Sequence, residues 1–433
     1  MSIPRIVIVG GGAGGIELAT RLGHSLGKGN KAEVILIDRN PTHIWKPLLH
    51  EVAVGAIDTD LDQVSYLSHS RANGYRFQLG TLSALDRGRQ QLSLSPLHDE
   101  NGDEILPERH LDYDYLVLAL GSVSNDFNTP GVKDNCFFLD SPQQAEKFRR
   151  EMLNTFLRTT SEGADAESRE LSVAIVGAGA TGVELSAELF NAIDMLSSYN
   201  ASDFPHSRLK VHIIEAAPRI LPALGERISE NVHRQLESLG VKIHTGTQVA
   251  KADEQGFETA DGERVDADLM VWAAGVRGPE VLSTLGLSTR PNHQIKVEQS
   301  MVSVDDSHVF AIGDCAACPQ PDDKLVPPRA QAAHQMASTL VKNIKLALDG
   351  KELKPFVYKD MGSLVSLSRF QTFGSLMSGR SVRGLFVEGW IARLSYDSLY
   401  RMHQLAIYGW PRTAAKVIVD RLNRWLRPHL KLH

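Results

Sequence analysis

One short pattern, a glycine-rich turn between a strand and a helix, constrains this chain more than any other feature. The β-branched run 5–9 has the composition of a strand buried on both faces, and residues 16–22 have apolar spacing suited to a helix. The turn between them reads Gly10-Gly11-Gly12-Ala13-Gly14-Gly15. Gly10, Gly12 and Gly15 fit G-x-G-x-x-G, whose glycines allow a tight turn, close approach to a pyrophosphate and close packing of helix on strand. The helix N-terminus also favours phosphate, so the turn predicts a dinucleotide site.

An acidic residue ends the next predicted strand. The run 34–37 is β-branched and apolar, and Asp38 follows it 23 residues after Gly15. A carboxylate at this place can accept hydrogen bonds from a ribose. Strand, glycines, helix and acid therefore agree on a dinucleotide-binding unit, and they leave open which dinucleotide it binds.

The same pattern occurs a second time. A strand over 171–176 leads into Gly177, Gly179 and Gly182, which refit the glycine template, and a helix follows. The next predicted strand ends in Glu215, 33 residues after Gly182, because a helical extension and a proline-containing loop intervene. An acid here favours the free 2′-hydroxyl of NADH over the 2′-phosphate of NADPH, although Arg219 nearby could soften that preference.

Two such units in one chain change the interpretation. We expect one of them to bind FAD permanently and the other to take a nicotinamide nucleotide. Flavin is a natural acceptor of hydride, so the task of the protein would be to bring the two rings face to face.

Small residues close several other predicted strands, as expected where backbone lies against a ligand. Ala119 and Gly121 follow the strand over 113–118, and Gly275 follows the strand that begins at Leu269. A further buried strand, 309–312, ends in glycine and acid at Asp314.

Two connecting segments are also of interest. The segment 42–50 contains Lys46 and is too broken by proline for a helix. It is either a loop at the reactive end of a cofactor or an ordinary connection. The polar run 160–168 predicts a flexible connection.

The composition excludes several classes of protein. The chain has 433 residues, 42% of them hydrophobic, which is enough for two or three domains. A net charge of −6 argues against nucleic acid as a partner, and three cysteines favour a reducing compartment. No signal peptide pattern opens the chain, and no apolar run reaches the roughly 20 residues that span a bilayer.

The C-terminal tail differs from the average. Residues 380–433 carry ten Lys or Arg against three acidic residues, a net charge of +7. Two amphipathic helices are predicted, over 390–402 and 413–427, each with an apolar, tryptophan-containing face. This pattern indicates helices that lie in the plane of an anionic membrane surface, or a pair that packs on the core or on a second subunit.

Together these features resemble the two-dinucleotide-binding-domain flavoproteins, and among them the bacterial type II NADH:quinone oxidoreductases. The resemblance covers almost the whole chain. It implies an α/β fold with two Rossmann-like domains, one inserted in the other, and a C-terminal α+β membrane-binding module. The implied ranges are 1–120 with 277–355 for FAD, 121–276 for NADH, and 356–433 for anchoring and dimerisation.

The resemblance also implies roles for individual residues. Asp314 would contact the ribityl–phosphate side of FAD, and Glu184 would lie near the nicotinamide. Gln331 and Gln335 fit an Ala-Gln-x-Ala-x-Gln motif beside the flavin and the quinone head, and their spacing of four places them on one helix face. Some relatives have lysine where Met361 stands, so a cationic role there is in doubt.

The resemblance implies an activity and a location. NADH would reduce FAD, and two electrons would pass to a quinone of the ubiquinone or menaquinone class without proton pumping. We expect a peripheral homodimer on the cytoplasmic side of the inner membrane, within the respiratory electron-transport chain. Cys315 and Cys318 leave open a soluble disulfide or flavin reductase with a redox-active dithiol, although buried packing cysteines are favoured and no metal site is seen. A slow NADH-sensing binding protein is the other alternative.

Overall fold

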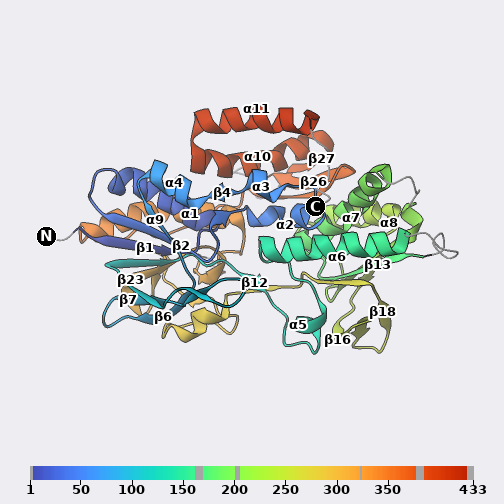
Figure 1. Ribbon diagram of the computed structural model, residues 1–433, viewed down its shortest axis with the longest axis horizontal. Coiled ribbons are helices and arrows are strands. Elements are labelled where there is room, and N and C mark those ends of the chain that lie inside the picture. Colours follow the sequence, from blue (N-terminus) through green and yellow to red (C-terminus); the bar gives the residue numbers. More distant parts are fainter. Residues whose placement is uncertain (1–2, 161–168, 200–204, 322–323, 377–384, 427–433) are drawn as a thin grey trace.

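The computed structural model describes residues 3–160, 169–199, 205–321, 324–376 and 385–426. Two parallel sheets form the body, and two C-terminal helices lie across it as the outermost layer at the top of Figure 1. The predicted linker at 160–168 lies outside the described residues, apart from its first residue.

The first parallel sheet contains the first glycine turn at its centre. Its strands are rich in β-branched residues and are buried in one core cluster with α1 and α9. Helix α1 (Ala13–Leu22) packs on α9 (Ala330–Leu348), and a methyl group on Gly14 would lie only 3.3 Å from the carbonyl oxygen of Ala333. In order across the sheet, the strands are β22 (Val302–Ser303), β23 (Asp306–Ala311), β11 (Tyr115–Leu118), β1 (Arg5–Val9), β2 (Glu33–Asp38) and β5 (Arg76–Leu79), with β22 antiparallel to the rest.

The second parallel sheet repeats this arrangement around the second glycine turn. Helices α7 (Ala180–Tyr199) and α6 (Pro142–Thr160) pack with it into a separate core cluster, and α8 (Glu226–Leu239) belongs to the same cluster. In order, its strands are β15 (Lys242–Thr245), β14 (Leu209–Glu215), β13 (Leu171–Val176) and β19 (Leu269–Trp272).

A two-stranded ribbon connects the sheets. The chain leaves the first sheet through β12 (Val123–Ser124) and returns through β20 (Val276–Arg277), and these two strands pair antiparallel. All strands of the second sheet lie between them in sequence, so its unit is inserted into the first. The precise domain limits given above stay a prediction.

Small antiparallel sheets flank both units. One contains β6 (Leu82–Asp86), β7 (Gln91–Leu94) and β10 (Arg109–Asp112), and a turn at 99–102 joins β8 (Leu97–His98) to β9 (Glu104–Leu106). The other contains β16 (Val249–Asp253), β17 (Gly256–Thr259) and β18 (Arg264–Asp266). Three short helices lie in the connections between strands: α3 (Thr59–Asp62), α4 (Tyr66–Asn73) and α5 (Val132–Asn135).

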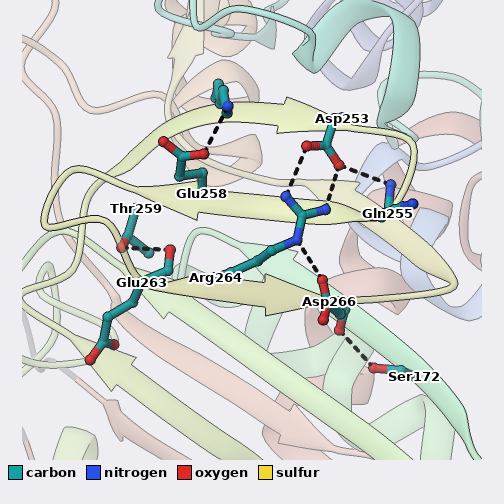
Figure 2. Close-up of polar contacts among 9 residues, drawn as sticks. Ser172, Asp253, Gln255, Glu258, Thr259, Glu263, Arg264 and Asp266 are labelled. Carbon is teal, nitrogen blue, oxygen red and sulfur yellow. Dashed lines mark hydrogen bonds and ion pairs between the residues drawn. The ribbon is translucent and has the colours of Figure 1, made fainter.

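The sheet of β16, β17 and β18 carries an ion-pair network on its surface. Figure 2 shows the Arg264 guanidinium donating two hydrogen bonds to Asp253, at 2.6 and 2.9 Å, and one to Asp266 at 2.6 Å. These bonds lower the pKa of Asp253. The Asp266 backbone carbonyl accepts a hydrogen bond from the Ser172 hydroxyl on β13, which connects this sheet to the parallel one.

The C-terminal module consists of a sheet and two helices. The sheet is antiparallel, with β25 (Gly362–Leu367), β26 (Gln371–Leu376) and β27 (Leu385–Glu388). Helix α10 (Gly389–Tyr408) packs on this sheet and on α1, and α11 (Trp410–Leu426) packs on α10 (Figure 1). Both predicted helices are present but begin earlier, and α10 is longer; Arg427, the predicted last residue, lies outside the described residues.

The interpretation of 42–50 was partly wrong. A short strand β3 (Thr42–His43) is followed by a 3₁₀ helix over Lys46–Leu48 and by α2 (Leu49–Ala53). Pro47 occupies the first turn of the 3₁₀ helix, where its missing N–H costs nothing, so it initiates the helical segment and does not break it.

Both glycine turns are built by the same steric constraint. Gly10 and Gly177 adopt φ of +103° and +104°, which L side chains avoid. A methyl group on Gly15 would lie 1.8 Å from the Gly10 carbonyl oxygen, and one on Gly182 would lie 2.0 Å from that of Gly177. The third glycine of each turn is therefore required for the helix to pack on its strand.

We expect Gly182→Ala to lower the free energy of unfolding by about 3 kcal/mol, because the added methyl group overlaps backbone that cannot move aside. Urea denaturation measures this loss. Gly179→Ala is the matched control, since its methyl group would meet no atom within 4 Å. Equal losses in the two variants would contradict the steric account.

Candidate active site

The first glycine turn has free space over its middle. A methyl group on Gly12 would meet no atom within 4 Å, so the backbone there is open to a ligand. The Asp38 carboxylate accepts the backbone N–H of Gly11 at 2.6 Å and that of Asn40 at 2.8 Å. Burial raises the pKa of Asp38. The predicted ribose acceptor thus also fixes the turn.

The second turn has the same geometry. Gly179 is open, and the Glu215 carboxylate accepts the backbone N–H of Ala178 at 2.7 Å and that of Ala217 at 2.9 Å. A carboxylate has about four acceptor positions, so each acid retains capacity for a ribose hydroxyl.

The guanidinium of Arg219 points to backbone and not to the end of β14. It donates hydrogen bonds to the carbonyl oxygens of Leu221, Pro222 and Leu224. These contacts leave it poorly placed to bind a 2′-phosphate beside Glu215.

The small residues at the strand ends have distinct surroundings. A methyl group on Gly10 would lie 2.4 Å from the carbonyl oxygen of Ala119, so this strand end supports the first turn. Gly121, with φ of +68°, faces open space. Gly275, with φ of +63°, is covered by the ring of Phe127.

Asp314 lies in a polar cluster with Lys46. The Ser122 hydroxyl donates to the Asp314 carboxylate at 2.8 Å, and Lys46 Nζ donates to the Ser122 carbonyl at 2.8 Å. Lys46 also contacts Asp140 at 3.1 Å. Burial raises the pKa of Asp314, and the charge of Lys46 opposes that shift. Asp314 and Ser122 line a cavity of about 210 Å³.

A second, larger cavity of about 850 Å³ brings distant segments together. One end is lined by the second glycine turn and by Glu215 and Gly275. The other end is lined by the start of α9, by β25 and by α10. The cavity therefore runs from the predicted nucleotide site to the C-terminal module.

Glu184 lies at the junction of these parts. It is buried near the start of α7, its carboxylate accepts the backbone N–H of Ser366 on β25 at 3.0 Å, and it bonds the Tyr396 hydroxyl of α10. Burial raises the pKa of Glu184 to about 8. His50 on α2 lies 3.8 Å from it, and burial lowers the pKa of that imidazole to about 4. At neutral pH we therefore expect a protonated carboxyl beside a neutral ring.

The two glutamines of α9 have different surroundings. The Gln331 side-chain oxygen accepts the Tyr358 hydroxyl at 2.5 Å and the Met361 N–H at 3.3 Å, and Gln331 lines the large cavity. Gln335 donates to the Lys359 carbonyl at 2.8 Å and accepts the Lys359 N–H at 3.0 Å, away from the cavity lining. Gln335 thus fixes the 358–361 segment against which Gln331 is placed.

Histidines that sequence reasoning did not assign also line the cavity. His334 contacts the buried Glu17 of α1 at 2.5 Å. His403 on α10 lies 2.8 Å from His43, nitrogen to nitrogen, and Trp45 stacks on the His403 ring. Glu17 is an acid on the buried side of α1, but its partner His334 is 317 residues away.

The comparisons with known proteins decide the family. The model of the pyridine nucleotide-disulphide oxidoreductase family matches residues 4–337. A type II NADH:quinone oxidoreductase of Haemophilus influenzae is 45% identical over 99% of both chains, and one of Staphylococcus aureus is 28% identical over 88% of this chain and 91% of that protein. This chain belongs to the type II NADH:quinone oxidoreductase family.

Solved structures agree with the fold of this type II oxidoreductase family. NDH2 of Plasmodium falciparum, solved in complex with NADH, superposes with a TM-score of 0.82 over 99% of this chain and all of that one, at 19% identity. The sulfide:quinone oxidoreductase of Aquifex aeolicus superposes with a TM-score of 0.72 over 94% and 92%, at 16% identity. The predicted family and the α/β fold are confirmed.

The cysteines of this family member do not have the surroundings of a reactive dithiol. Cys315 and Cys318 are free and buried, and burial raises the pKa of each thiol to about 12. A thiol is nucleophilic only as its thiolate, so this shift disfavours the reactive form of both groups at neutral pH. Among the described residues, no group of three or more His, Cys, Asp or Glu could hold a metal ion.

The raised pKa of Glu184 makes stability depend on pH. An unfolded glutamate titrates near 4.3, so between about pH 4.5 and pH 8 the folded protein retains a proton that the unfolded chain loses. Stability contributed by this group therefore falls as pH rises through that window. Between pH 5 and pH 9, we expect the free energy of unfolding of Glu184→Gln to rise relative to that of wild type by a few kcal/mol. The expected size is on the order of 1.4 kcal/mol per unit of pKa difference.

Urea unfolding at both pH values measures this gain. Glu230→Gln, on the exposed face of α8, is the control and should follow wild type. If Glu184→Gln and wild type respond equally to pH, the carboxyl is not protonated in the folded protein.

Proposed function

We propose that this chain oxidises NADH and reduces a membrane quinone, with the balance NADH + H⁺ + quinone → NAD⁺ + quinol. The cavity that joins the second glycine turn to Gln331 and α10 carries this proposal, because it gives a nucleotide and a second substrate access to one place. The 45% identity to the H. influenzae enzyme over the whole chain supports the same activity.

The first unit fits FAD. Open backbone at Gly12 leaves room for a pyrophosphate, and Asp38 lies at the end of β2 for a ribose. The buried Asp314, backed by Ser122 and Lys46, offers a carboxylate near Gly121, where the backbone is also open. When bound, FAD accepts a hydride from NADH and delivers two electrons to a quinone. The set assigned to it is Gly10, Gly12, Gly14, Gly15, Asp38, Lys46, Ala119, Gly121 and Asp314.

The second unit fits NADH. Its open glycine, Gly179, faces the large cavity, and Glu215 lines the same cavity, so a ribose with a free 2′-hydroxyl would meet an acceptor. The positions assigned to the nucleotide are Gly177, Gly179, Gly182, Glu215 and Gly275. Glu184, protonated at neutral pH, would present a neutral hydrogen-bonding group to the nicotinamide end of the cavity.

The quinone would enter between α9, β25 and α10. Gln331 lines this end and would offer its amide to a quinone carbonyl, while Gln335 positions the 358–361 segment. A neutral amide bonds quinone and quinol without a strong preference, which suits turnover. Met361 is exposed and carries no charge, so this site lacks the cation that some relatives have there.

We expect Gln331→Ala to lower the rate of quinone reduction about tenfold or more, because a hydrogen bond to the quinone is lost. Reduction of the bound flavin by NADH, followed by absorbance in the absence of quinone, should stay near the wild-type rate. Gln335→Ala separates positioning from contact and should raise the quinone KM more than it lowers kcat. Normal values in both half-reactions for Gln331→Ala would refute this quinone site.

The outer faces of α10 and α11 favour a peripheral location on the membrane. Among the described residues, no helix is both long and apolar enough to cross a bilayer. Exposed apolar side chains instead cover these two helices, while the region from 380 onward carries a net charge of +7. The apolar set is Trp390, Leu394, Leu405, Trp410, Ile418, Val419 and Leu422. The cytoplasmic side of the inner membrane is the location we propose, with a homodimer formed through part of the same surface.

A triple variant with Trp410→Ser, Ile418→Ser and Leu422→Ser tests this surface. These side chains are 73, 61 and 52% exposed, so their loss should leave the fold intact and lower binding to anionic phospholipid vesicles at least about tenfold. Removing α10 entirely is a poorer test, because that helix lines the large cavity.

Ile105→Ser with Val304→Ser, at side chains 57 and 50% exposed and outside the C-terminal module, is the control and should bind vesicles as wild type does. Unchanged vesicle binding by the triple variant would refute the membrane surface. If sedimentation shows that this variant has lost a dimer instead, the surface belongs to a second copy.

A further inference from the structure

The segment between the two parallel sheets contains a conformation that the proposed chemistry does not explain. Directly after β12, Phe127 and Asn128 adopt φ of +51° and +55°, in the left-handed region. Asparagine tolerates this region, whereas it is unfavourable for an aromatic residue with a bulky side chain. Such strain persists only where the surroundings determine it.

Hydrogen bonds and ion pairs on both sides hold this turn. The Phe127 N–H donates to the Asn125 side chain at 3.0 Å, and the Trp272 indole donates to the Asn125 carbonyl at 2.8 Å. Asp126 is buried, with Lys133 at 3.4 Å and Arg277 at 3.7 Å. The turn is therefore fixed to the second unit and to the returning ribbon strand.

The strained backbone presents an exposed ring. The Phe127 side chain is 60% exposed and lines the large cavity, and its ring lies against Gly275, where a methyl group would be 2.6 Å from it. An exposed apolar side chain alone is ordinary. Here the exposed ring belongs to a residue with a left-handed backbone. The backbone strain at Phe127 is therefore not offset by burial of its side chain.

We propose that Phe127 forms the outer wall of the nicotinamide nucleotide site and packs its ring against bound NADH. Gly179, Glu215 and Thr247 line the same cavity, so a dinucleotide on the second glycine turn would pass within reach of the ring. Binding would cover the exposed face of the ring and recover the burial that the free protein lacks. This inference rests on the proposed NADH site.

The test separates ring contact from fold. Phe127→Asn removes the ring and suits the left-handed backbone, so thermal stability should not fall and should rise by a few degrees, about what relief of such strain gives. In the FAD-loaded enzyme, the NADH dependence of flavin reduction should show a Kd raised about tenfold. Phe127→Tyr keeps the ring and should bind NADH within about twofold of wild type.

Leu67→Asn removes an equally exposed side chain elsewhere and should leave the Kd unchanged. An unchanged Kd for NADH in Phe127→Asn overturns the inference. A Kd raised equally in Phe127→Tyr and Phe127→Asn overturns it as well. A higher Kd together with a lower melting temperature in Phe127→Asn would show that Phe127 stabilises the fold, and would also overturn the inference. Failure of the wild type itself to reduce quinone with NADH would instead refute the proposed function.

Discussion

The close approach of two helices to the strands before them is the constraint on which this structure depends. In each glycine turn the third glycine lies against the carbonyl of the first, closer than any side chain permits. That contact directs the helix N-terminus toward the end of the sheet. The acid at the end of the neighbouring strand then bonds a backbone N–H of the turn. In each unit, steric contact between two glycines thus positions the helix, and one carboxylate, Asp38 or Glu215, fixes the glycine turn.

Where the C-terminal module meets the nucleotide-binding units, buried titratable groups accompany the apolar contacts. Glu17 lies 2.5 Å from both His334 and Arg21, His43 meets His403, and Glu184 bonds the backbone of β25. Removing such groups from water is costly unless each finds a partner. The partners come from segments far apart in the chain. The contacts of His43 with α10 and of Glu184 with β25 connect the C-terminal module to the nucleotide-binding units.

Local patterns predicted the parts of this fold that local physics determines. Gly10, Gly15, Gly177 and Gly182 are required by turns of a few residues, and strands 5–9 and 171–176 follow from β-branched composition. The 3₁₀ helix at Lys46 was missed because proline both breaks helices and begins them.

The surroundings of the candidate site were less predictable. Spacing placed Gln331 and Gln335 on one helix face, but not the segment at Lys359 that Gln335 binds. The contacts between Glu17 and His334 and between His43 and His403 join residues more than 300 positions apart. No periodicity records such pairs, since they arise only from the packing of whole units.

The position of helix α10 determines how a hydrophobic substrate would reach the large cavity. One of its faces, with Tyr396, Leu399 and His403, lines the large cavity, and the opposite face carries exposed Trp390 and Leu394. An α-helix is only about 10 Å across. With the outer face in lipid, a hydrophobic molecule would move from bilayer to cavity past the thickness of a single helix. Its isoprenoid tail could stay dissolved in the hydrocarbon while its head group reacts, so product release would need no passage through water.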